Sequence, residues 1–482
     1  MEKLNVNVAI ERGLTTADAA NRPIKLIQFG EGNFLRAFVD WIVQQLNNNG
    51  LFNGNVAIVQ PLPFGRVAEL EKQNNLYTVI LEGLKNGREV QSREVIDSVG
   101  KTVDPYQDFD AYLALADDPN TQIIISNTTE AGIALSDEDS ADAKPAKSYP
   151  GKLAQLLKRR FDKGLPGFLI VPCELIADNG VALKKCLEET AEKFGYGEDF
   201  VKWLDEENTF VSTLVDRIVP GFPRDNAEAL WDELGYRDDN MVKAEPFLLW
   251  AVAGSKEAQA KVDELIPAKR LGIDLVTADA VQPYRERKVY LLNGPHTTMA
   301  QVARLAGFTT VGEVMNDPTM RSFIEKEMHE DIIPVLTLPE DELNAFADAV
   351  CERYSNPFVK HALDSIGLNS VSKFTARLLP LVTANVEAGR GLPKRIVLAL
   401  SALLATYGGL AEQPVNINDS DDVVARIQDA AADRATFVTN ALGDASLWGS
   451  DLNGIEGLTE AVEANVAAIE QDGIQPLIDA LA

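Results

Sequence analysis

One short segment of the chain concentrates side chains that can move a proton. Its sequence is Arg287-Lys288-Val289-Tyr290-Leu291-Leu292-Asn293-Gly294-Pro295-His296. A lysine that is desolvated near other cations can lose its proton close to neutral pH. Asn293 can donate a hydrogen bond to a carbonyl or alkoxide oxygen, and His296 can orient a neighbouring hydroxyl. Lys288, Asn293 and His296 therefore suit acid–base chemistry between an alcohol and a carbonyl.

The spacing of these residues limits how a helix can present them. At about 100° per residue, positions five apart on an α-helix point about 140° away from each other. A helix carrying Lys288 and Asn293 would therefore have to enter a pocket end-on. Without further evidence, a buried histidine at the start of a helix, such as His296, more often has a structural role than a catalytic one.

A second candidate proton donor lies one turn upstream of the lysine. Tyr284 and Lys288 have the Tyr-x3-Lys spacing of the short-chain dehydrogenases. That family has a single, smaller domain and a catalytic serine before the tyrosine, and Leu271–Pro283 contains no serine. Tyr284 is therefore the weaker alternative to Lys288.

A metal site is not expected. The three histidines and three cysteines show no ligand-spaced cluster and no CxxC pair: His296, His329, His361, Cys173, Cys186 and Cys351. Reduced, buried thiols and metal-independent chemistry are the predictions.

The first glycine-rich turn predicts a dinucleotide site. The strand-like run Ile24–Phe29 leads into Gly30-Glu31-Gly32 and then into the helical pattern Asn33–Leu46. Gly30 permits a tight turn, Gly32 leaves room for a pyrophosphate, and a helix N-terminus attracts that anion. The third glycine of the usual fingerprint is absent, so a plain glycine turn is the alternative. The candidate cofactor-binding residues here are Ile27, Phe29, Gly30, Glu31, Gly32, Asn33, Phe34, Leu35 and Arg36.

Two further strand ends bear on the cofactor. The run Asn55–Gln60 ends in Gln60, where the fingerprint expects an acid for the ribose hydroxyl, so NAD over NADP is not secured there. Asn127 and Thr128 follow the run Gln122–Ser126, at a strand end where open α/β sheets bind ligands. Both are candidate cofactor-binding residues, with a polar helix-capping loop as the alternative.

The secondary-structure patterns divide the chain in two. The strand-like runs, which alternate with helical segments, are Ile24–Phe29, Asn55–Gln60, Gln122–Ser126, Gly167–Val171 and Phe210–Val215. This alternation predicts an α/β fold with a doubly wound parallel sheet. Leu76–Glu94 looks like an inserted hairpin that turns at Asn86-Gly87. The later helical periodicity predicts residues 1–275 as a Rossmann-like dinucleotide-binding domain and residues 276–482 as a mostly α-helical substrate and catalytic domain.

Composition excludes several partners. The net charge of −28 over 482 residues argues against nucleic acid and anionic membranes. Anionic ligands would need locally basic pockets, for which the candidates are Lys288, Lys373, Arg217 and the pair Arg285 and Arg287. No apolar run reaches the roughly 20 residues of a membrane helix, and Ile396–Tyr407 suits a buried helix. The first residues do not form a signal peptide, so a cytoplasmic location is expected.

The motif Lys288-x4-Asn293-x2-His296 resembles the signature of the polyol-specific long-chain dehydrogenases, the mannitol dehydrogenase family. The resemblance extends over nearly the whole chain. It includes the runs Gln28–Arg36, Ser126–Gly132, Pro172–Ile176, Ser212–Ile218 and Asn356–His361. Within the family, these runs are similar to a branch that acts on sugar acids rather than to mannitol dehydrogenase itself.

The resemblance implies a Rossmann domain, a helical domain and an active site in the cleft between them. It implies NAD as the cofactor, Lys288 as the general acid and base, and Asn293 and His296 as supporting groups. Asp216, Arg217 and Lys373 are the candidate substrate-binding residues. One departure concerns the family's Cys-Asp-Asn, which is Cys173-Glu174-Leu175 here. Leu175 cannot hold the reacting oxygen, so either Asn293 acts alone or Asn179 substitutes.

The expected activity is reversible NAD-dependent reduction of a keto sugar acid. Another keto-acid reductase or a polyol dehydrogenase is the alternative within the family, and a non-catalytic dinucleotide sensor is the alternative outside it. The sequence leaves the oligomeric state open and is compatible with a monomer.

Overall fold

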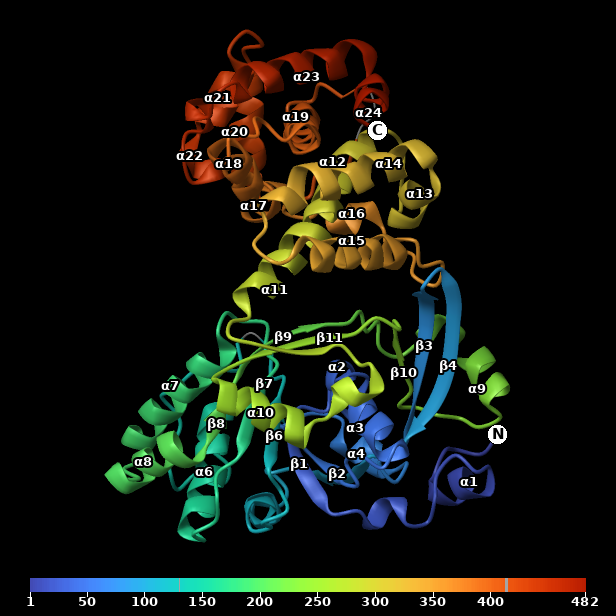
Figure 1. Ribbon diagram of the computed structural model, residues 1–482, viewed down its shortest axis with the longest axis vertical. Helices are drawn as coiled ribbons and strands as arrows, with labels where there is room; N and C mark the ends of the chain where they lie inside the picture. The colour runs from blue at the N-terminus through green and yellow to red at the C-terminus, as the bar shows by residue number, and fades with distance from the viewer. Residues whose placement is uncertain (130, 412–414) are drawn as a thin grey trace. The chain divides into compact units, whose positions relative to one another are not determined.

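The computed structural model of the protein describes residues 1–129, 131–411 and 415–482 (Figure 1). The chain forms two compact units. Unit 1 comprises Met1–Glu82 and Glu89–Val281, and unit 2 comprises Gly83–Arg88 and Gln282–Ala482. The boundary expected from the sequence, after residue 275, falls slightly before this division.

Unit 1 contains a six-stranded parallel sheet. Its strands, in spatial order, are β5 (Val99–Val103), β2 (Asn55–Val59), β1 (Ile24–Phe29), β6 (Ile123–Ser126), β7 (Leu169–Pro172) and β8 (Thr209–Phe210). Every neighbouring pair is parallel. The strand order reverses between β1 and β6, and this switch point is where doubly wound sheets bind ligands. The predicted Rossmann-like sheet is confirmed.

Alternating side chains of the strands build a core on each face of this sheet. Leu26 packs on one face with helix α3 (Val39–Asn48), and the next residue, Ile27, packs on the other face with helix α6 (Tyr149–Asp162). Both faces are apolar because a parallel sheet is covered by helices on both sides. Burial on two faces explains why β1 and β2 are almost continuously hydrophobic.

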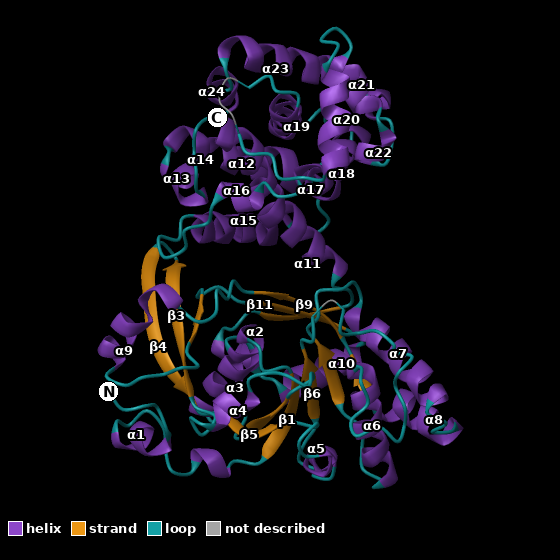
Figure 2. Cartoon of the chain, turned by 180° about the vertical axis from the view of Figure 1, so that it is seen from behind, coloured by secondary structure: helices purple, strands orange, loops and turns teal. Residues whose placement is uncertain are grey.

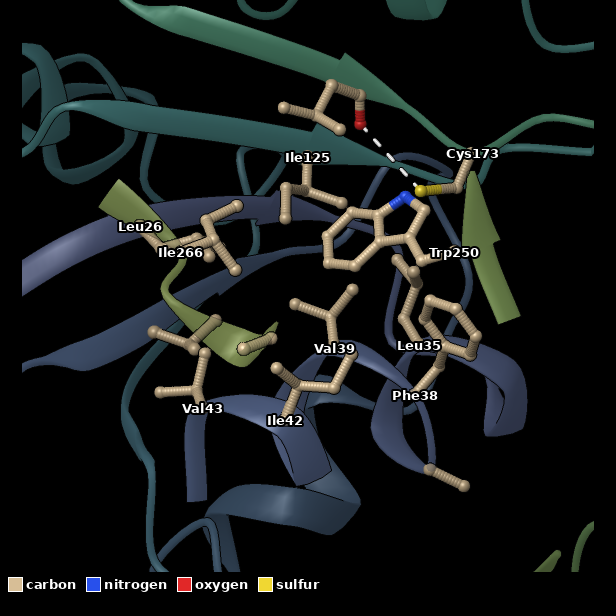
Figure 3. Close-up of a cluster of buried hydrophobic side chains, with 14 of the residues drawn as sticks. Leu26, Leu35, Phe38, Val39, Ile42, Val43, Ile125, Cys173, Trp250 and Ile266 are labelled. Carbon is tan, nitrogen blue, oxygen red and sulfur yellow. Dashed lines mark hydrogen bonds between the residues drawn. The ribbon is translucent and has the colours of Figure 1, made fainter. Parts of the chain in front are cut away.

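A second, three-stranded sheet covers the α3 side. It has the order β12 (Leu275–Ala278), β11 (Leu249–Ala253) and β9 (Ser212–Asp216). Trp250 of β11 lies over α3, where its ring contacts Phe38 at 5.5 Å between centroids, and Leu35 and Cys173 join the same cluster (Figure 3). The Cys173 thiol is buried and lies 3.8 Å from the Val171 carbonyl oxygen. Cys173, Cys186 and Cys351 are all free thiols as expected, but Cys186 is only partly buried.

The structure confirms one sequence-based expectation for unit 1 and corrects another. The expected hairpin is confirmed: β3 (Tyr77–Lys85) and β4 (Arg88–Ile96) flank Asn86 and Gly87, both of which have positive φ. The prediction of a single strand at Phe210–Val215 is wrong. That run is divided between β8 in the main sheet and β9 in the second sheet.

Apart from the tip of the β3–β4 hairpin, the described part of unit 2 is built from helices (Figure 2). The longer ones are α12 (Gly294–Leu305), α14 (Pro318–Lys326), α15 (Glu340–Tyr354), α17 (Ser370–Arg377), α18 (Leu379–Glu387), α19 (Lys394–Tyr407), α20 (Asp421–Ala431) and α23 (Leu458–Asp472). Every residue of α12 is buried, and in α19 only Lys394 is not. A helix that is buried on every side lies inside a bundle. The buried helix expected at Ile396–Tyr407 is confirmed. Among the described residues, no helix has the length and apolar character to span a bilayer.

Candidate active site

Lys288 and Asn293 lie at the two ends of a π-helical turn in unit 2. This turn, Lys288–Asn293, joins α11 (Gln282–Arg287) to α12. The Gly294 N–H donates to the Val289 carbonyl five residues earlier, the bond that defines a π-helix. A π-helix is wider than an α-helix and holds more residues per turn, so positions 288 and 293 diverge less around the axis than they would in an α-helix. The expected separation of about 140° is wrong, since it assumed α-helical geometry.

Local sequence explains the wide turn. Pro295 has no N–H to donate to the Leu291 carbonyl, and its ring crowds that carbonyl. Side chains bind neighbouring carbonyls instead: the Tyr354 hydroxyl donates to Leu292 O, and Thr297 Oγ1 donates to Asn293 O at 2.9 Å. These two side-chain hydrogen bonds therefore stabilise the π-helical turn. Such turns occur frequently at functional sites.

His296 follows this turn and is 9% exposed. Its ring lies 4.3 Å from the Tyr354 ring and 4.8 Å from the His361 ring, between centroids. Burial, followed by the nearby His361 and other basic groups, lowers the pKa of His296 well below its usual value, so the ring is neutral. Among the described residues, none forms a hydrogen bond to His296 Nε2. A buried, neutral nitrogen of this kind can orient a ligand hydroxyl.

Tyr284, the alternative proton donor, is buried in α11. Burial, and then Glu342, raises the pKa of its phenol, while the Arg287 guanidinium 5.1 Å above the ring lowers it. A phenol with a raised pKa is a poor base near neutral pH. The environment of Tyr284 therefore favours a packing role.

The expected substrate-binding residues have different surroundings. Lys373 lies on α17 of unit 2, and its Nζ donates to the Ile366 carbonyl at 2.8 Å. Asp216 and Arg217 are buried in unit 1, at the end of β9. The Arg217 guanidinium donates to the carbonyls of Ala37 and Glu245 at 2.7 and 2.9 Å and lies over the Trp41 ring. These contacts join the second sheet to the start of α3. Arg217 therefore has a structural role.

The two glycines after β1 differ in what requires them. Gly30 has a φ of +121°, and a Cβ there would approach the Asn127 carbonyl to 3.0 Å. Gly32 has a φ of −64°, which any residue adopts, and a Cβ there would meet no described atom within 4 Å. Contacts within the protein therefore explain why position 30 is a glycine, but they do not explain why position 32 is one. A ligand that approaches the main chain closely, such as a pyrophosphate, fits the glycine at 32.

The residues after these glycines mainly shape the turn. Helix α2 (Asn33–Arg36) is a single turn, so it carries less of a dipole than the long helix expected from Asn33–Leu46. Arg36 is buried and donates to Glu31 O, Asn240 O and Asn33 Oδ1 at 3.1, 2.6 and 2.7 Å. Leu35 lies under Gly30, and the Phe34 ring stacks on Phe38 at 4.9 Å. The side chains of Ile27 and Phe29 are core residues, so only their main chain can face a ligand.

A carboxylate is present near the end of β2, although Gln60 is not one. Gln60 is buried, and its Nε2 donates to Leu62 O at 3.0 Å. Glu31 Oε1 accepts from the Arg66 N–H at 3.3 Å. A Cβ on Gly65 would lie 2.2 Å from Glu31 Oε1 and 2.5 Å from Gln60 Oε1, so both side chains converge on Gly65. Glu31 is therefore one carboxylate near this strand end, and Asp104 is another, since its Oδ2 accepts from Gln60 Nε2 at 3.3 Å.

The loop after β6 is held by Glu174, a residue whose role the sequence did not reveal. The buried Glu174 carboxylate accepts from Ser126 Oγ at 3.1 Å and from Thr128 N and Oγ1 at 2.9 Å each. Asn127 Nδ2 donates to the Cys173 carbonyl at 2.7 Å. The loop that carries Asn127 and Thr128 is therefore fixed beside Gly30. The only sign of Glu174 in the sequence was an acid two residues after a buried strand.

Asn179 cannot replace the missing asparagine at Leu175. It is fully buried, and its Nδ2 donates to the carbonyls of Pro172, Glu174 and Thr213 at 3.0 to 3.1 Å. Its Oδ1 accepts from Thr213 N at 2.8 Å. The hypothesis that Asn179 holds a reacting oxygen is wrong, because its amide is committed to the main chain. Leu175 is exposed.

The described residues contain no group of three or more His, Cys, Asp or Glu side chains placed to hold a metal ion. Metal independence remains a prediction.

Both units match models of one family. Residues 24–264 match the mannitol dehydrogenase Rossmann domain, and residues 280–470 match the mannitol dehydrogenase C-terminal domain. The chain is 42% identical to an altronate oxidoreductase of Phocaeicola vulgatus and 41% identical to one of Shigella flexneri, in each case over 95% of this chain and 97% of the relative.

Solved structures share the fold. Pseudomonas fluorescens mannitol 2-dehydrogenase, in a ternary complex with NAD and D-mannitol, has a TM-score of 0.68 at 23% identity and covers 99% of both chains. A D-sorbitol dehydrogenase has a TM-score of 0.82 at 21% identity over 99% of this chain and 100% of that one. With both domain models matched and 42% identity along nearly the full length, the chain belongs to the mannitol dehydrogenase family.

Proposed function

We propose that this protein is an altronate oxidoreductase, which interconverts D-altronate and D-tagaturonate with NAD⁺ and NADH. Its similarity to altronate oxidoreductases at 40–42% identity along 95% of the chain supports this substrate pair. The observation that carries the chemistry is the π-helical turn, which brings Lys288 and Asn293 closer to one side of the helix than an α-helix would, immediately before the neutral His296.

Unit 1 has the features needed to hold NAD. The switch point between β1 and β6, the space at Gly32 and the fixed Asn127–Thr128 loop suit a pyrophosphate and its riboses. Glu31, near the end of β2, suits a ribose hydroxyl and would repel the 2′-phosphate of NADP. When bound, NAD supplies the hydride acceptor for oxidation and, as NADH, the hydride donor for reduction.

Unit 2 supplies the groups for proton transfer. In reduction, the Lys288 ammonium donates a proton to the carbonyl oxygen of the keto acid, and in oxidation the neutral amine removes it from the hydroxyl. The Asn293 amide N–H donates to the same oxygen and stabilises the charge that develops there. His296 Nε2 orients a neighbouring hydroxyl of the substrate. Because Asn179 is committed elsewhere, Asn293 acts without a second asparagine.

The activity is tested with the purified protein by following NADH absorbance. D-Tagaturonate, D-fructuronate and D-fructose are each offered with NADH and with NADPH, and D-altronate and D-mannitol are offered with NAD⁺. We expect the highest kcat/KM for tagaturonate with NADH. A higher kcat/KM for fructuronate would make the protein a fructuronate reductase, and one for fructose would make it a mannitol dehydrogenase. Dinucleotide binding without turnover of any substrate would identify a sensor.

A further inference from the structure

Unit 2 contains a group of basic side chains that the proton chemistry does not use. His361, Arg353, Arg377 and Lys373 all lie close enough to His296 to lower its pKa electrostatically. They come from α15, α17 and the segment between these helices. Burial lowers the pKa of His361, so its ring is neutral near pH 7, but Arg353, Arg377 and Lys373 still form a concentration of positive charge in a chain with a net charge of −28. A local excess of one charge attracts a ligand of the opposite charge.

Arg377 differs from the three fully buried arginines of this unit, each of which pairs with a carboxylate. Arg287 pairs with Glu342 at 2.7 Å, Arg304 with Asp364 at 2.8 Å, and Arg395 with Asp331 at 3.3 Å. Arg377 is half-buried, and within the described parts of the chain no carboxylate pairs with it. Its Nη1 donates to the Thr297 hydroxyl at 3.3 Å. Burial lowers the pKa of Arg377 from its ordinary value, since desolvation disfavours the cation.

A bound anion would offset this cost. A guanidinium that is taken out of water without a counter-charge destabilises the fold, and a carboxylate relieves it through two parallel N–H···O bonds. Arginine presents a planar fork that fits a carboxylate better than a lysine ammonium does.

The position of Arg377 connects it with the reactive turn. Its partner Thr297 donates to the carbonyl of Asn293, one turn earlier on the same helix. Four helical residues rise about 6 Å, a distance comparable to the length of a sugar-acid chain. Asn293 and Arg377 are thus placed to hold two ends of one small molecule.

Lys373 lies one turn before Arg377 on α17, so both side chains are on one face. Its Nζ is already held by the Ile366 carbonyl, and Asp419 is near enough to oppose part of its charge. Lys373 therefore adds positive charge near the ligand, while the Arg377 guanidinium has further N–H groups that can donate to it.

We propose that Arg377 binds the carboxylate of the sugar acid and that it selects sugar acids over uncharged ketoses and polyols. This inference rests on the proposed function, because it names the residue that recognises the acid group of that substrate. An uncharged ligand would leave the guanidinium half-buried and unpaired, which penalises its binding.

The test compares Arg377→Ala and Arg377→Lys with the wild type. KM and kcat for tagaturonate are measured, together with inhibition constants for D-altronate and for D-altritol, which has a hydroxymethyl group in place of the carboxylate. We expect Arg377→Ala to lose about 30-fold or more in kcat/KM, mainly through KM, because removing one partner of a buried charge pair costs at least about 2 kcal/mol. The preference for altronate over altritol should disappear in this variant.

Two additions separate binding from folding. Added guanidinium ion should restore part of the Arg377→Ala activity, and Arg377→Lys should fall between that variant and the wild type. Arg426→Ala is the matched control, because Arg426 is exposed on α20 and pairs with Asp422. It should keep wild-type kinetics.

The two proposals fail differently. A wild-type protein that does not reduce tagaturonate contradicts the proposed function. If the wild type reduces tagaturonate, then an unchanged preference for altronate over altritol in folded Arg377→Ala or Arg377→Lys overturns the role of Arg377. Loss of activity in Arg377→Ala without a change in KM and without guanidinium rescue overturns it as well.

Discussion

Lys288 and Asn293 lie at the two ends of the π-helical turn that leads into α12, where they diverge less around the helix axis than they would in an α-helix. In an α-helix the two residues would diverge, and only one could meet a given oxygen. The π-helix therefore lets one short segment provide both a proton donor and a hydrogen-bond donor. Pro295 and the Tyr354 hydroxyl maintain this geometry from positions that need not contact the substrate.

The two glycines of the first turn provide a matched pair of variants. Gly32→Ala should leave the free energy of unfolding within about 0.5 kcal/mol of the wild type, because its Cβ meets no described atom. Its NAD⁺ affinity should fall about tenfold, or about 1.4 kcal/mol, because the methyl group occupies ligand space. Gly30→Ala should instead lose about 1–3 kcal/mol of stability, since alanine is strained at a φ of +121°. Calorimetric titration and urea unfolding measure both effects. Unchanged NAD⁺ affinity in Gly32→Ala would mean that the loop is only a turn.

Glu31 should determine the choice between NAD and NADP. Glu31→Gln removes the negative charge near the end of β2 while keeping an acceptor for the Arg66 N–H. We expect the ratio of kcat/KM with NADH to that with NADPH to fall about tenfold, because the repulsion of a 2′-phosphate is lost. Glu69→Gln, an exposed change on the neighbouring helix α4 (Val67–Glu71), is the control. An unaltered ratio in Glu31→Gln would place the discrimination elsewhere.

Glu174 should act on the cofactor through the loop that it holds. Glu174→Ala leaves the donors of Ser126 and Thr128 without their acceptor, which costs about 1–3 kcal/mol for buried groups. We expect NAD⁺ to bind about tenfold more weakly, whereas Glu174→Asp should recover part of that affinity. The exposed Glu189→Gln on α7 (Asn179–Lys193) should change neither affinity nor stability. Calorimetry that shows wild-type NAD⁺ affinity in folded Glu174→Ala would refute this role.

The buried Glu327 should make unit 2 less stable at alkaline pH. Burial raises the pKa of Glu327 to about 8, and the Thr298 hydroxyl donates to its carboxyl group. A carboxyl group with a raised pKa contributes stability that is complete below its unfolded pKa, near 4.5, and is lost as the pH rises through about 8. Glu327→Gln removes this dependence, an effect of a few kcal/mol at most. Melting temperatures between pH 5 and 9 check it, because the wild type should lose more than Glu327→Gln does. Parallel curves would show that Glu327 is not protonated in the folded protein.

Much of unit 1 could be predicted from the sequence because its strands are buried on both faces. The runs at Ile24–Phe29 and Asn55–Val59 are nearly continuous apolar segments, which a parallel sheet requires. Strand β5, Val99–Val103, was missed because it lies at the sheet edge and includes Gly100 and Lys101. Periodicity also could not reveal that the chain moves from one sheet to another between Phe210 and Ser212.

The candidate site was predictable as a set of residue types but not as a geometry. The motif identified Lys288, Asn293 and His296, while helical periodicity gave no sign of a π-helix. Asn179 has a suitable side chain in a suitable position along the chain, and only the contacts reveal that its amide is occupied. The environments of Glu31, Glu174 and Arg377 depend on residues distant in sequence, so no local pattern could assign them.

The turnover of Lys288→Ala tests the central claim most directly. Positioned proton transfer contributes about 10²- to 10⁴-fold, so kcat for tagaturonate reduction should fall by that factor while NADH binding is retained. Tyr284→Phe, measured beside it, should keep most of its activity because the Tyr284 phenol is buried with a raised pKa. If Lys288→Ala retains near-normal kcat, or if Tyr284→Phe is the more damaged enzyme, Lys288 is not the acid and base of this reaction.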